Sequence, residues 1–260
     1  MTRVLPRSTW PETAARAAAT LAVVVAIAWA FSGTEFDLAR LAEGVPRMGE
    51  FLARMVPPDM GVVDTVATSV VETLQIAILG TAIGAVFSFL LALAGAANLA
   101  PPWVHQPVRW LLAVLRAIPV ILLALLFVAS VGLGPFPGVL ALALHSTGML
   151  GKFYAESFEN ARRGPIEALE SAGASWAQRV RYGVITQTLP DLARDTLFRF
   201  EMNLRESLVL GLVGAGGIGF YIQLYTRSFQ YDKVATLTVV VLALVVIVEQ
   251  ASVFVRARLR

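Results

Sequence analysis

The sequence predicts an all-α membrane protein with about six transmembrane helices, because its composition and its apolar runs both point that way. Hydrophobic residues make up 57% of the 260 residues and charged residues only 15%, and the mean hydropathy is +0.70. Soluble domains are about 25% charged, so this chain has too few charged residues to cover a water-soluble surface. A helix needs about 20 mainly apolar residues to cross the hydrocarbon core, and six such runs follow one another along the chain.

The first three runs differ in how they begin, pack and end. They are the segments Ala14–Phe31, Val66–Leu99 and Val108–Val131. No small-residue cleavage site follows the first run, so we expect a retained span rather than a signal peptide. Gly80 and Gly84 give the second run a small face for close helix contact, and Pro101 and Pro102 end it. Pro119 inside the third run predicts a kink.

Two of the last three runs hold polar groups in their interior. The three runs are Gly138–Phe158, Leu192–Leu212 and Val234–Val255. His145 lies at the middle of the fourth run beside Ser146 and Thr147, where polar groups are unfavourable unless they face other helices or water. The fifth run is the least apolar and contains the charged residues Arg194, Asp195, Arg199, Glu201, Arg205 and Glu206.

The arginines between the runs predict the orientation of the chain, since positively charged loops stay in the cytoplasm. Placing the N-terminus inside also puts these basic residues inside: Arg3, Arg7, Arg109, Arg162, Arg163, Arg179, Arg181, Arg256, Arg258 and Arg260. The outer side then receives residues 132–137 and residues 36–61, in which arginines and acidic residues balance. We therefore expect both termini inside and, from its amphipathic spacing, a short surface helix within residues 36–61.

The composition and the distribution of certain residues argue against several kinds of site. There is no cysteine, and the two histidines, His105 and His145, lie far apart, so we expect no metal site. The net charge is +3, but the basic residues lie between apolar runs rather than along one stripe, so no nucleic-acid partner is expected. No zinc-protease, serine-nucleophile or paired-carboxylate motif of an intramembrane enzyme is present, and we assign no catalytic residue.

A polar loop of about residues 160–190 separates the fourth and fifth runs. Its centre predicts a short helix, a turn at Gly173 and a second short helix, displayed in water for a partner. This loop resembles the coupling loop of ABC importer permeases, which reads Glu-Ala-Ala, three residues, Gly, nine residues, Ile, one residue, Leu-Pro. Glu167, Ala168 and Gly173 match, whereas Gly183 stands at the isoleucine position. The resemblance implies ATPase coupling through Glu167, Ala168, Glu170, Gly173, Ala174, Ser175 and Gln178.

Glycines follow the fifth run in the spacing G-x-G-x-x-G, at Gly214, Gly216 and Gly219. In dinucleotide-binding proteins this spacing follows a strand and opens a helix within a βαβ unit. Here an apolar run precedes it, and no alternating strand pattern lies nearby. We expect instead a gate or a tight turn with close backbone packing at the outer mouth of the bundle, formed by these glycines and Gly217.

Three further segments narrow the resemblance to one family of permeases. Arg116-Ala117-Ile118-Pro119, Val131–Phe136 and Leu142–Lys152 precede the two motifs described above. Together these segments resemble the permease subunit of phosphonate-type ABC importers. The resemblance implies the type I importer permease fold, with a transport core in residues 63–260 and an N-terminal span plus external amphipathic segment in residues 1–62.

The functional expectation follows from this resemblance. It implies a multi-pass permease in the inner membrane of a bacterium, which serves an ATP-driven importer for phosphonate, phosphite or phosphate and is not itself an enzyme. It further implies a homodimer of permeases, an external phosphonate- or phosphate-binding protein and two cytoplasmic ATPases. The ATPases would hold ATP and Mg²⁺, since this chain has no P-loop and no cofactor of its own. The intramembrane groups that could face the anion path are Arg116, His145, Asn203 and Arg205.

Two other interpretations stay open at this stage. A permease of the same class for an amino acid or an osmolyte would carry the same loop and topology. An independent channel or secondary transporter would be favoured by inverted halves with paired broken helices, which the sequence does not show. Such a transporter would also have no use for the coupling-like loop.

Overall fold

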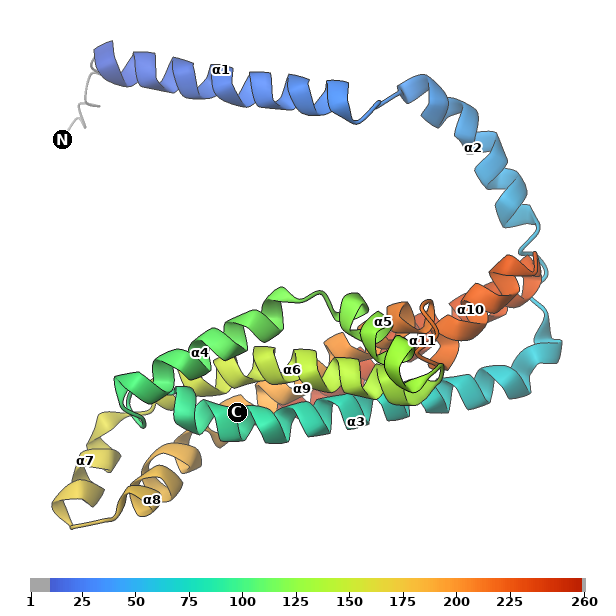
Figure 1. The fold of residues 1–260 in the computed structure, drawn as a ribbon. Coiled ribbons are helices and arrows are strands. Elements are labelled where there is room, and N and C mark those ends of the chain that lie inside the picture. Colours follow the sequence, from blue (N-terminus) through green and yellow to red (C-terminus); the bar gives the residue numbers. More distant parts are fainter. Residues whose placement is uncertain (1–9, 259–260) are drawn as a thin grey trace, which may run out of the picture. The chain divides into compact units, whose positions relative to one another are not determined.

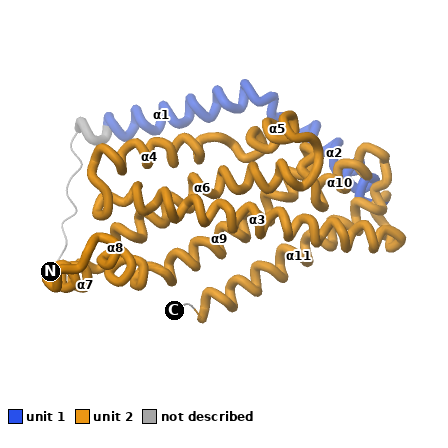
Figure 2. The backbone as a smooth tube through the Cα atoms, turned by 60° about the horizontal axis from the view of Figure 1, so that its bottom comes forward, with its two compact units in different colours: residues 1–53 blue, residues 54–260 orange. Residues whose placement is uncertain are grey.

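The computed structural model describes residues 10–258, which fold into helices joined by short connections, with no strand among them (Figure 1). The all-α prediction is therefore confirmed over the described part of the chain. The chain divides into two compact units at the Ala53–Arg54 junction, which Figure 2 colours separately. The basic residues Arg3, Arg7 and Arg260, used above to orient the chain ends, lie outside the described residues.

The first unit holds two helices. They are α1 (Trp10–Gly33) and α2 (Leu38–Ala53). The stretch Ala14–Gly33 of α1 is long and apolar enough to cross a membrane, and its side chains are exposed, as those of a lipid-facing helix are. In α2 the apolar face expected of an amphipathic helix is formed by Leu41, Val45, Met48 and Leu52. Both predicted helices are confirmed, and the location of α2 at the membrane surface stays a prediction.

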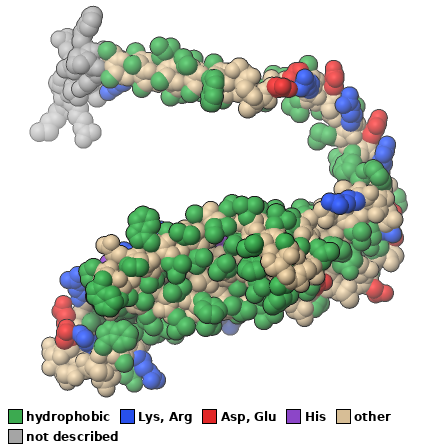
Figure 3. Space-filling model, in the orientation of Figure 1, with side chains coloured by type: hydrophobic (Ala, Val, Ile, Leu, Met, Phe, Trp, Pro, Cys, Tyr) green, Lys and Arg blue, Asp and Glu red, His purple; other side chains and the backbone are tan. Residues whose placement is uncertain are grey.

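The second unit holds the remaining helices in the order expected from the sequence. The predicted spans correspond to α3 (Val63–Gly95), α4 (Pro102–Ala117) with α5 (Val120–Val131), α6 (Pro135–Glu159), α9 (Thr186–Gly211) and α11 (Tyr231–Arg258). The shorter segments are a 3-10 helix (Met60–Val62), α7 (Arg163–Ser171), α8 (Trp176–Gln178), a π-helical segment (Arg179–Ile185) and α10 (Gly217–Arg227). Figure 3 shows hydrophobic side chains over the visible face of this bundle and charged side chains gathered toward its two ends.

Not every predicted span is apolar enough to be recognised by composition alone. Among the described helices three are long and apolar enough to cross a membrane, or four if α4 and α5 count as one bent span. Helices α6 and α9 do not meet that standard, although they have 25 and 26 residues. Both bury polar side chains inside the bundle, among them Ser146, Thr147, Arg199 and Asn203. These buried polar residues therefore face other helices rather than lipid.

Helices α3 and α6 lie close together because of the small residues between them. A methyl group added at Gly80 would lie 2.6 Å from Cβ of Leu142, and one added at Gly84 would lie 2.6 Å from Cβ of Ser146. The predicted small face for close helix contact is thus confirmed. Helix α3 ends at Gly95, before the predicted end at Leu99.

The predicted third span is broken rather than kinked. Helix α4 ends at Ala117 and α5 begins at Val120, and the two helix axes differ by 83° (Figure 1). Ile118 has an extended conformation, with φ −81° and ψ 119°. A residue that precedes a proline is disfavoured in the helical region, so Pro119 ends α4 as well as opening α5. The predicted kink therefore underestimated the change of direction between the two helices.

Candidate functional site

A buried polar cluster joins α3, α6 and α9 in the middle of the second unit. Arg199 of α9 donates to both carboxylate oxygens of Glu206, at 2.8 and 3.2 Å, and to Oγ of Ser146 at 2.9 Å. Asn203 donates to Oγ of Ser146 at 2.9 Å and to Oγ1 of Thr81 at 2.7 Å. Each of the three helices therefore supplies at least one member of a single hydrogen-bonded network, which we call the central polar cluster.

The central polar cluster holds a charge that would be unstable without its partner. The Arg199 side chain is 1% exposed and the Glu206 side chain 20% exposed. Burying an unpaired charge is very unfavourable, and a bidentate Arg–carboxylate pair with further hydrogen bonds is the arrangement that compensates for it. Glu206 therefore neutralises a guanidinium that lipid could not accommodate.

Sequence reasoning selected Asn203 from this cluster but did not select Arg199 or Glu206. Residues 199, 203 and 206 follow the i, i+4, i+7 spacing of one helix face, and that spacing is the signal that could have found them. Asn203 is fully buried between helices, so its role in this conformation is to connect α9 with Thr81 and Ser146. His145 lies next to the cluster in sequence, and its Nδ1 atom is buried without a hydrogen-bond partner among the described residues.

Arg205 points away from the central polar cluster. It pairs with Glu249 of α11 at 3.1 Å, and both side chains are half exposed. Glu201 of α9 pairs in the same direction with Arg256 of α11, at 2.5 Å. The structure therefore separates Arg205 from Asn203, although both are on α9. Arg116, the remaining predicted path residue, lies apart from both in the last turn of α4 and lines a cavity against α6.

The polar loop between α6 and α9 has the predicted helix–turn–helix form. Helix α7 ends in a Schellman motif, in which Gly173 N–H donates to the carbonyl of Glu170 and Ala174 N–H donates to the carbonyl of Leu169. Gly173 has φ +77°, a conformation that favours glycine. Ser175 then caps α8 through a reciprocal pair of hydrogen bonds with Gln178.

Two contacts hold this loop together and attach it to the bundle. Arg179 forms a 2.6 Å ion pair with Glu170, which ties the segment after α8 to α7. The Trp176 indole donates to the carbonyl of Leu99 at 3.2 Å. Glu167, Ala168 and the other predicted coupling residues are mainly exposed, so the surface they form is open to a partner.

Gly183, which stands where the coupling-loop pattern has isoleucine, lies at a close contact within the loop. Gly183 belongs to the π-helical segment, and a methyl group added there would lie 3.2 Å from side-chain atoms of both Ile166 and Leu169. The π-helical segment and α7 thus pack closely at Gly183, where even a methyl group would make a tight contact. The second half of the loop is present as α8 and the π-helical segment.

The glycine-rich segment after α9 forms a tight turn between α9 and α10, and Gly219 lies beyond that turn, within α10. Gly214, Gly216 and Gly217 have φ of +90°, +79° and +70°. The turn brings α10 back against α3, where Ile218 N–H donates to Oγ1 of Thr73 at 2.9 Å. Since a helix rather than a strand precedes these glycines, the dinucleotide-binding interpretation of their spacing is excluded for this chain.

Comparison with known proteins decides the family. Residues 80–260, more than half of the chain, match the family described as binding-protein-dependent transport system inner membrane component. The chain belongs to this family. It is therefore a multi-pass permease subunit of the inner membrane, not an enzyme, and the hydrolysis of ATP falls to a separate subunit.

Relatives with assigned names are similar over most of the permease. The phosphite transport system permease protein PtxC of Stutzerimonas stutzeri is 42% identical over 217 residues, covering 83% of this chain and 79% of the relative. The putative phosphite permease HtxC of the same organism is 39% identical over 238 residues, covering 91% and 82%. The phosphate-import permease protein PhnE of Mycolicibacterium smegmatis is 39% identical over 230 residues, covering 88% of this chain and 43% of that longer protein.

Solved structures share the fold. An inward-facing structure of the MetNI methionine ABC transporter matches with a TM-score of 0.69 at 19% identity, covering 78% of this chain and 99% of that one. An amino acid ABC transporter matches with a TM-score of 0.64 at 17% identity, covering 76% and 95%. At these identities the likeness establishes the type I importer permease fold alone.

Proposed function

We propose that this permease serves an ATP-driven importer for a small phosphorus oxyanion: phosphite, a phosphonate or phosphate. The observation that carries the proposal is the 42% identity to the phosphite permease PtxC, which extends over 79% of that protein. Two further relatives named for phosphite and phosphate support the same class of solute. The similarity to amino acid permeases is confined to the fold and supports no amino acid substrate.

The partners follow from the family and from the exposed loop. An external binding protein delivers the oxyanion, and a pair of cytoplasmic ATPases docks on α7, α8 and the turn at Gly173. We assign residues 63–260 to the transport core and both termini to the cytoplasm. The second permease of the complex is another copy of this chain. Coupling requires that the ATPase pair contact the α7–α8 loop differently in the two transport states, because equal contacts would shift no equilibrium.

The proposed path residues differ in how available their charges are. Arg116 lines a cavity and forms no ion pair with any described residue, so its charge is available. His145 offers a polar atom rather than a charge, because its buried Nδ1 has no hydrogen-bond partner among the described residues. The charge of Arg205 is shared with Glu249 and becomes available to an anion only if that pair opens. Asn203 acts on the path through the central polar cluster rather than by direct contact.

Uptake measurements test the proposal directly. The permease is co-expressed with its ATPase and binding protein in a bacterium that lacks its own phosphorus importers, and uptake of radiolabelled phosphite, phosphate and methylphosphonate is recorded. We expect ATP-dependent uptake of at least one of them, which unlabelled methylphosphonate, phosphite or phosphate reduces by competition. Uptake of an amino acid without uptake of any phosphorus oxyanion would refute the proposal.

A further inference from the structure

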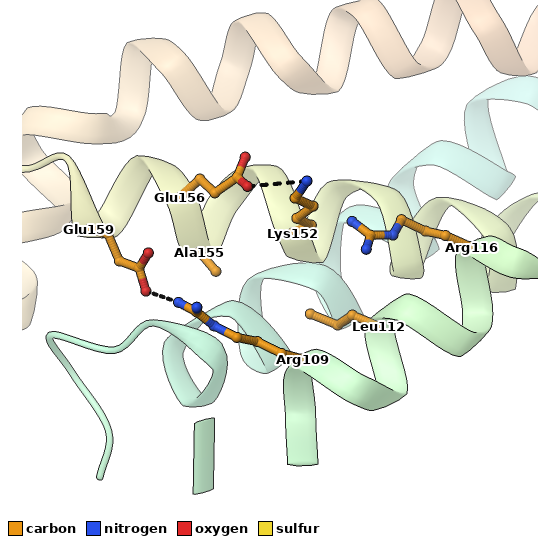
Figure 4. Close-up of a pocket in the computed structure, with 7 residues that line it drawn as sticks. All are labelled: Arg109, Leu112, Arg116, Lys152, Ala155, Glu156 and Glu159. Atoms are coloured by element: carbon orange, nitrogen blue, oxygen red, sulfur yellow. Dashed lines mark hydrogen bonds and ion pairs between the residues drawn. The ribbon is translucent and has the colours of Figure 1, made fainter. Parts of the chain in front are cut away.

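A cavity of about 250 Å³ lies between α4 and the C-terminal half of α6. Figure 4 shows that its charged side chains come from both helices and that Arg116 extends along it toward Lys152. The residues that line it are Arg109, Leu112, Arg116, Lys152, Ala155, Glu156 and Glu159. Since the average volume of a water molecule in the liquid is about 30 Å³, the cavity has room for an oxyanion of five heavy atoms together with water.

Glycines of α6 bring α4 close enough to place Arg116 at this cavity. A methyl group added at Gly148 would lie 3.1 Å from the backbone nitrogen and from Cγ of Arg116, and one added at Gly151 would lie 2.6 Å from Leu112. The backbone of Arg116 is therefore held against α6, two residues before Ile118 breaks the helix. Arg116 is also in the last turn of α4, where the helix dipole favours a cation.

The cavity has one more positive charge than its own carboxylates neutralise. Arg109 pairs with Glu159 and also donates to the carbonyl of Gly95 at 2.9 Å. Lys152 pairs with Glu156 at 3.3 Å. Arg116 forms no ion pair or hydrogen bond with any residue between 10 and 258. A partly buried guanidinium within a membrane-spanning segment is unfavourable unless an anion or water compensates for it.

We infer that this cavity binds one phosphate-type oxyanion, with Arg116 as its main ligand. The guanidinium presents parallel N–H donors that match two oxygens of such a group, which a lysine ammonium cannot do. Lys152 supplies a second positive charge that remains partly shared with Glu156. The carboxylates of Glu156 and Glu159 set the strength of the site, because each lowers the potential that an anion meets.

Two sources carry this chemistry: a free phosphorus oxyanion and the headgroup of an anionic phospholipid. The first source rests on the proposed function, since it makes the cavity a stopping point for the transported solute. The second is compatible with the outer face of α4, where Trp103 and Trp110 are largely exposed, as aromatic residues at a membrane interface are.

The test is a binding measurement on the purified full-length permease. One arm measures binding of radiolabelled phosphate and phosphite in detergent, and the other measures retention of phosphatidylglycerol against phosphatidylcholine by native mass spectrometry. For the probe that binds, Arg116→Gln should weaken binding at least about tenfold, as expected for loss of a charged hydrogen bond. Glu156→Gln should strengthen binding several-fold, since it frees Lys152. Arg227→Gln, an exposed arginine on α10, is the charge-matched control and should change neither arm.

Arg116→Gln and Glu156→Gln are expected to change binding in opposite directions, so each variant tests the inference separately. If Arg116→Gln fails to fold, Glu156→Gln still decides, because that side chain is half exposed and its removal leaves the packing intact. The inference is overturned if the wild type, Arg116→Gln and Glu156→Gln bind each probe with the same affinity. Oxyanion uptake that persists in Arg116→Gln with unchanged binding overturns the inference but not the proposed function. If the permease transports no phosphorus oxyanion but binds phospholipid, and Arg116→Gln abolishes that binding, the proposed function is refuted and the inference stands.

Discussion

Neutralising Glu206 should destabilise the permease far more than neutralising the exposed carboxylate of Glu249. Glu206→Gln leaves the Arg199 guanidinium, which is 1% exposed, without its carboxylate. Breaking a buried ion pair in this way costs about 3–5 kcal/mol of unfolding free energy. Glu249→Gln is the matched control. Glu249 of α11 pairs with Arg205, which is on α9 like Arg199, but both side chains of this pair are about half exposed. Since other helices do not enclose this pair, removing its carboxylate should cost less free energy of unfolding than removing that of Glu206.

A second variant separates the lost pair from the lost packing. In the double variant Arg199→Met with Glu206→Gln, no charge remains in the central polar cluster, so most of the stability lost in Glu206→Gln should return. The assay is reversible unfolding of the purified permease in mixed micelles, followed by circular dichroism, with each variant measured at the same protein concentration. The reasoning is refuted if Glu206→Gln is no less stable than Glu249→Gln, or if the double variant is no more stable than Glu206→Gln.

Three other substitutions test the helix packing, the loop and the path. Gly84→Leu should reduce the free energy of unfolding by about 1–3 kcal/mol or more, since its Cβ would lie 2.6 Å from Cβ of Ser146. The control Gly44→Leu should leave stability unchanged, because nothing lies within 4 Å of a Cβ added there. Equal melting curves for the two variants would contradict the close contact at Gly84. Gly173→Asp, whose side chain would enter open space, should leave the permease in the membrane while uptake and ATPase co-purification fall, and unchanged uptake would sink the coupling assignment. Arg205→Ala should lower uptake without loss of ATPase association, and full uptake would remove it from the path.

The helices and the turns could be predicted from the sequence because their causes are local. Apolar runs of membrane length mark the spans, and the small-residue spacing of Gly80 and Gly84 marks the contact of α3 with α6. The positive φ at Gly173 is required by a Schellman motif, and the capping of α8 follows from Ser175 and Gln178, three residues apart.

The partners of the polar groups could not be predicted in this way, because they belong to other helices. Nothing in the sequence near Arg199 shows that Ser146, 53 residues earlier, accepts hydrogen bonds from both Arg199 and Asn203. The 83° break between α4 and α5 is likewise larger than a proline alone requires, since prolines within helices often cause only a bend. Helix α4 also packs closely on Gly148 and Gly151 of α6, a contact between helices that the sequence around Pro119 does not show.

The way α9 distributes its charges explains how the least apolar span can lie in a membrane bundle, and it ranks the path residues. One face of α9 holds the Arg199–Glu206 pair against α3 and α6, and the other pairs Glu201 and Arg205 with α11. Each of these charges is thus neutralised within the subunit. Arg116 is different, because no described residue neutralises it and a cavity lies beside it. An anion that approaches Arg205 must first compete with Glu249, whereas one that approaches Arg116 need not displace a carboxylate. A phosphorus oxyanion should therefore bind to Arg116 in preference to Arg205.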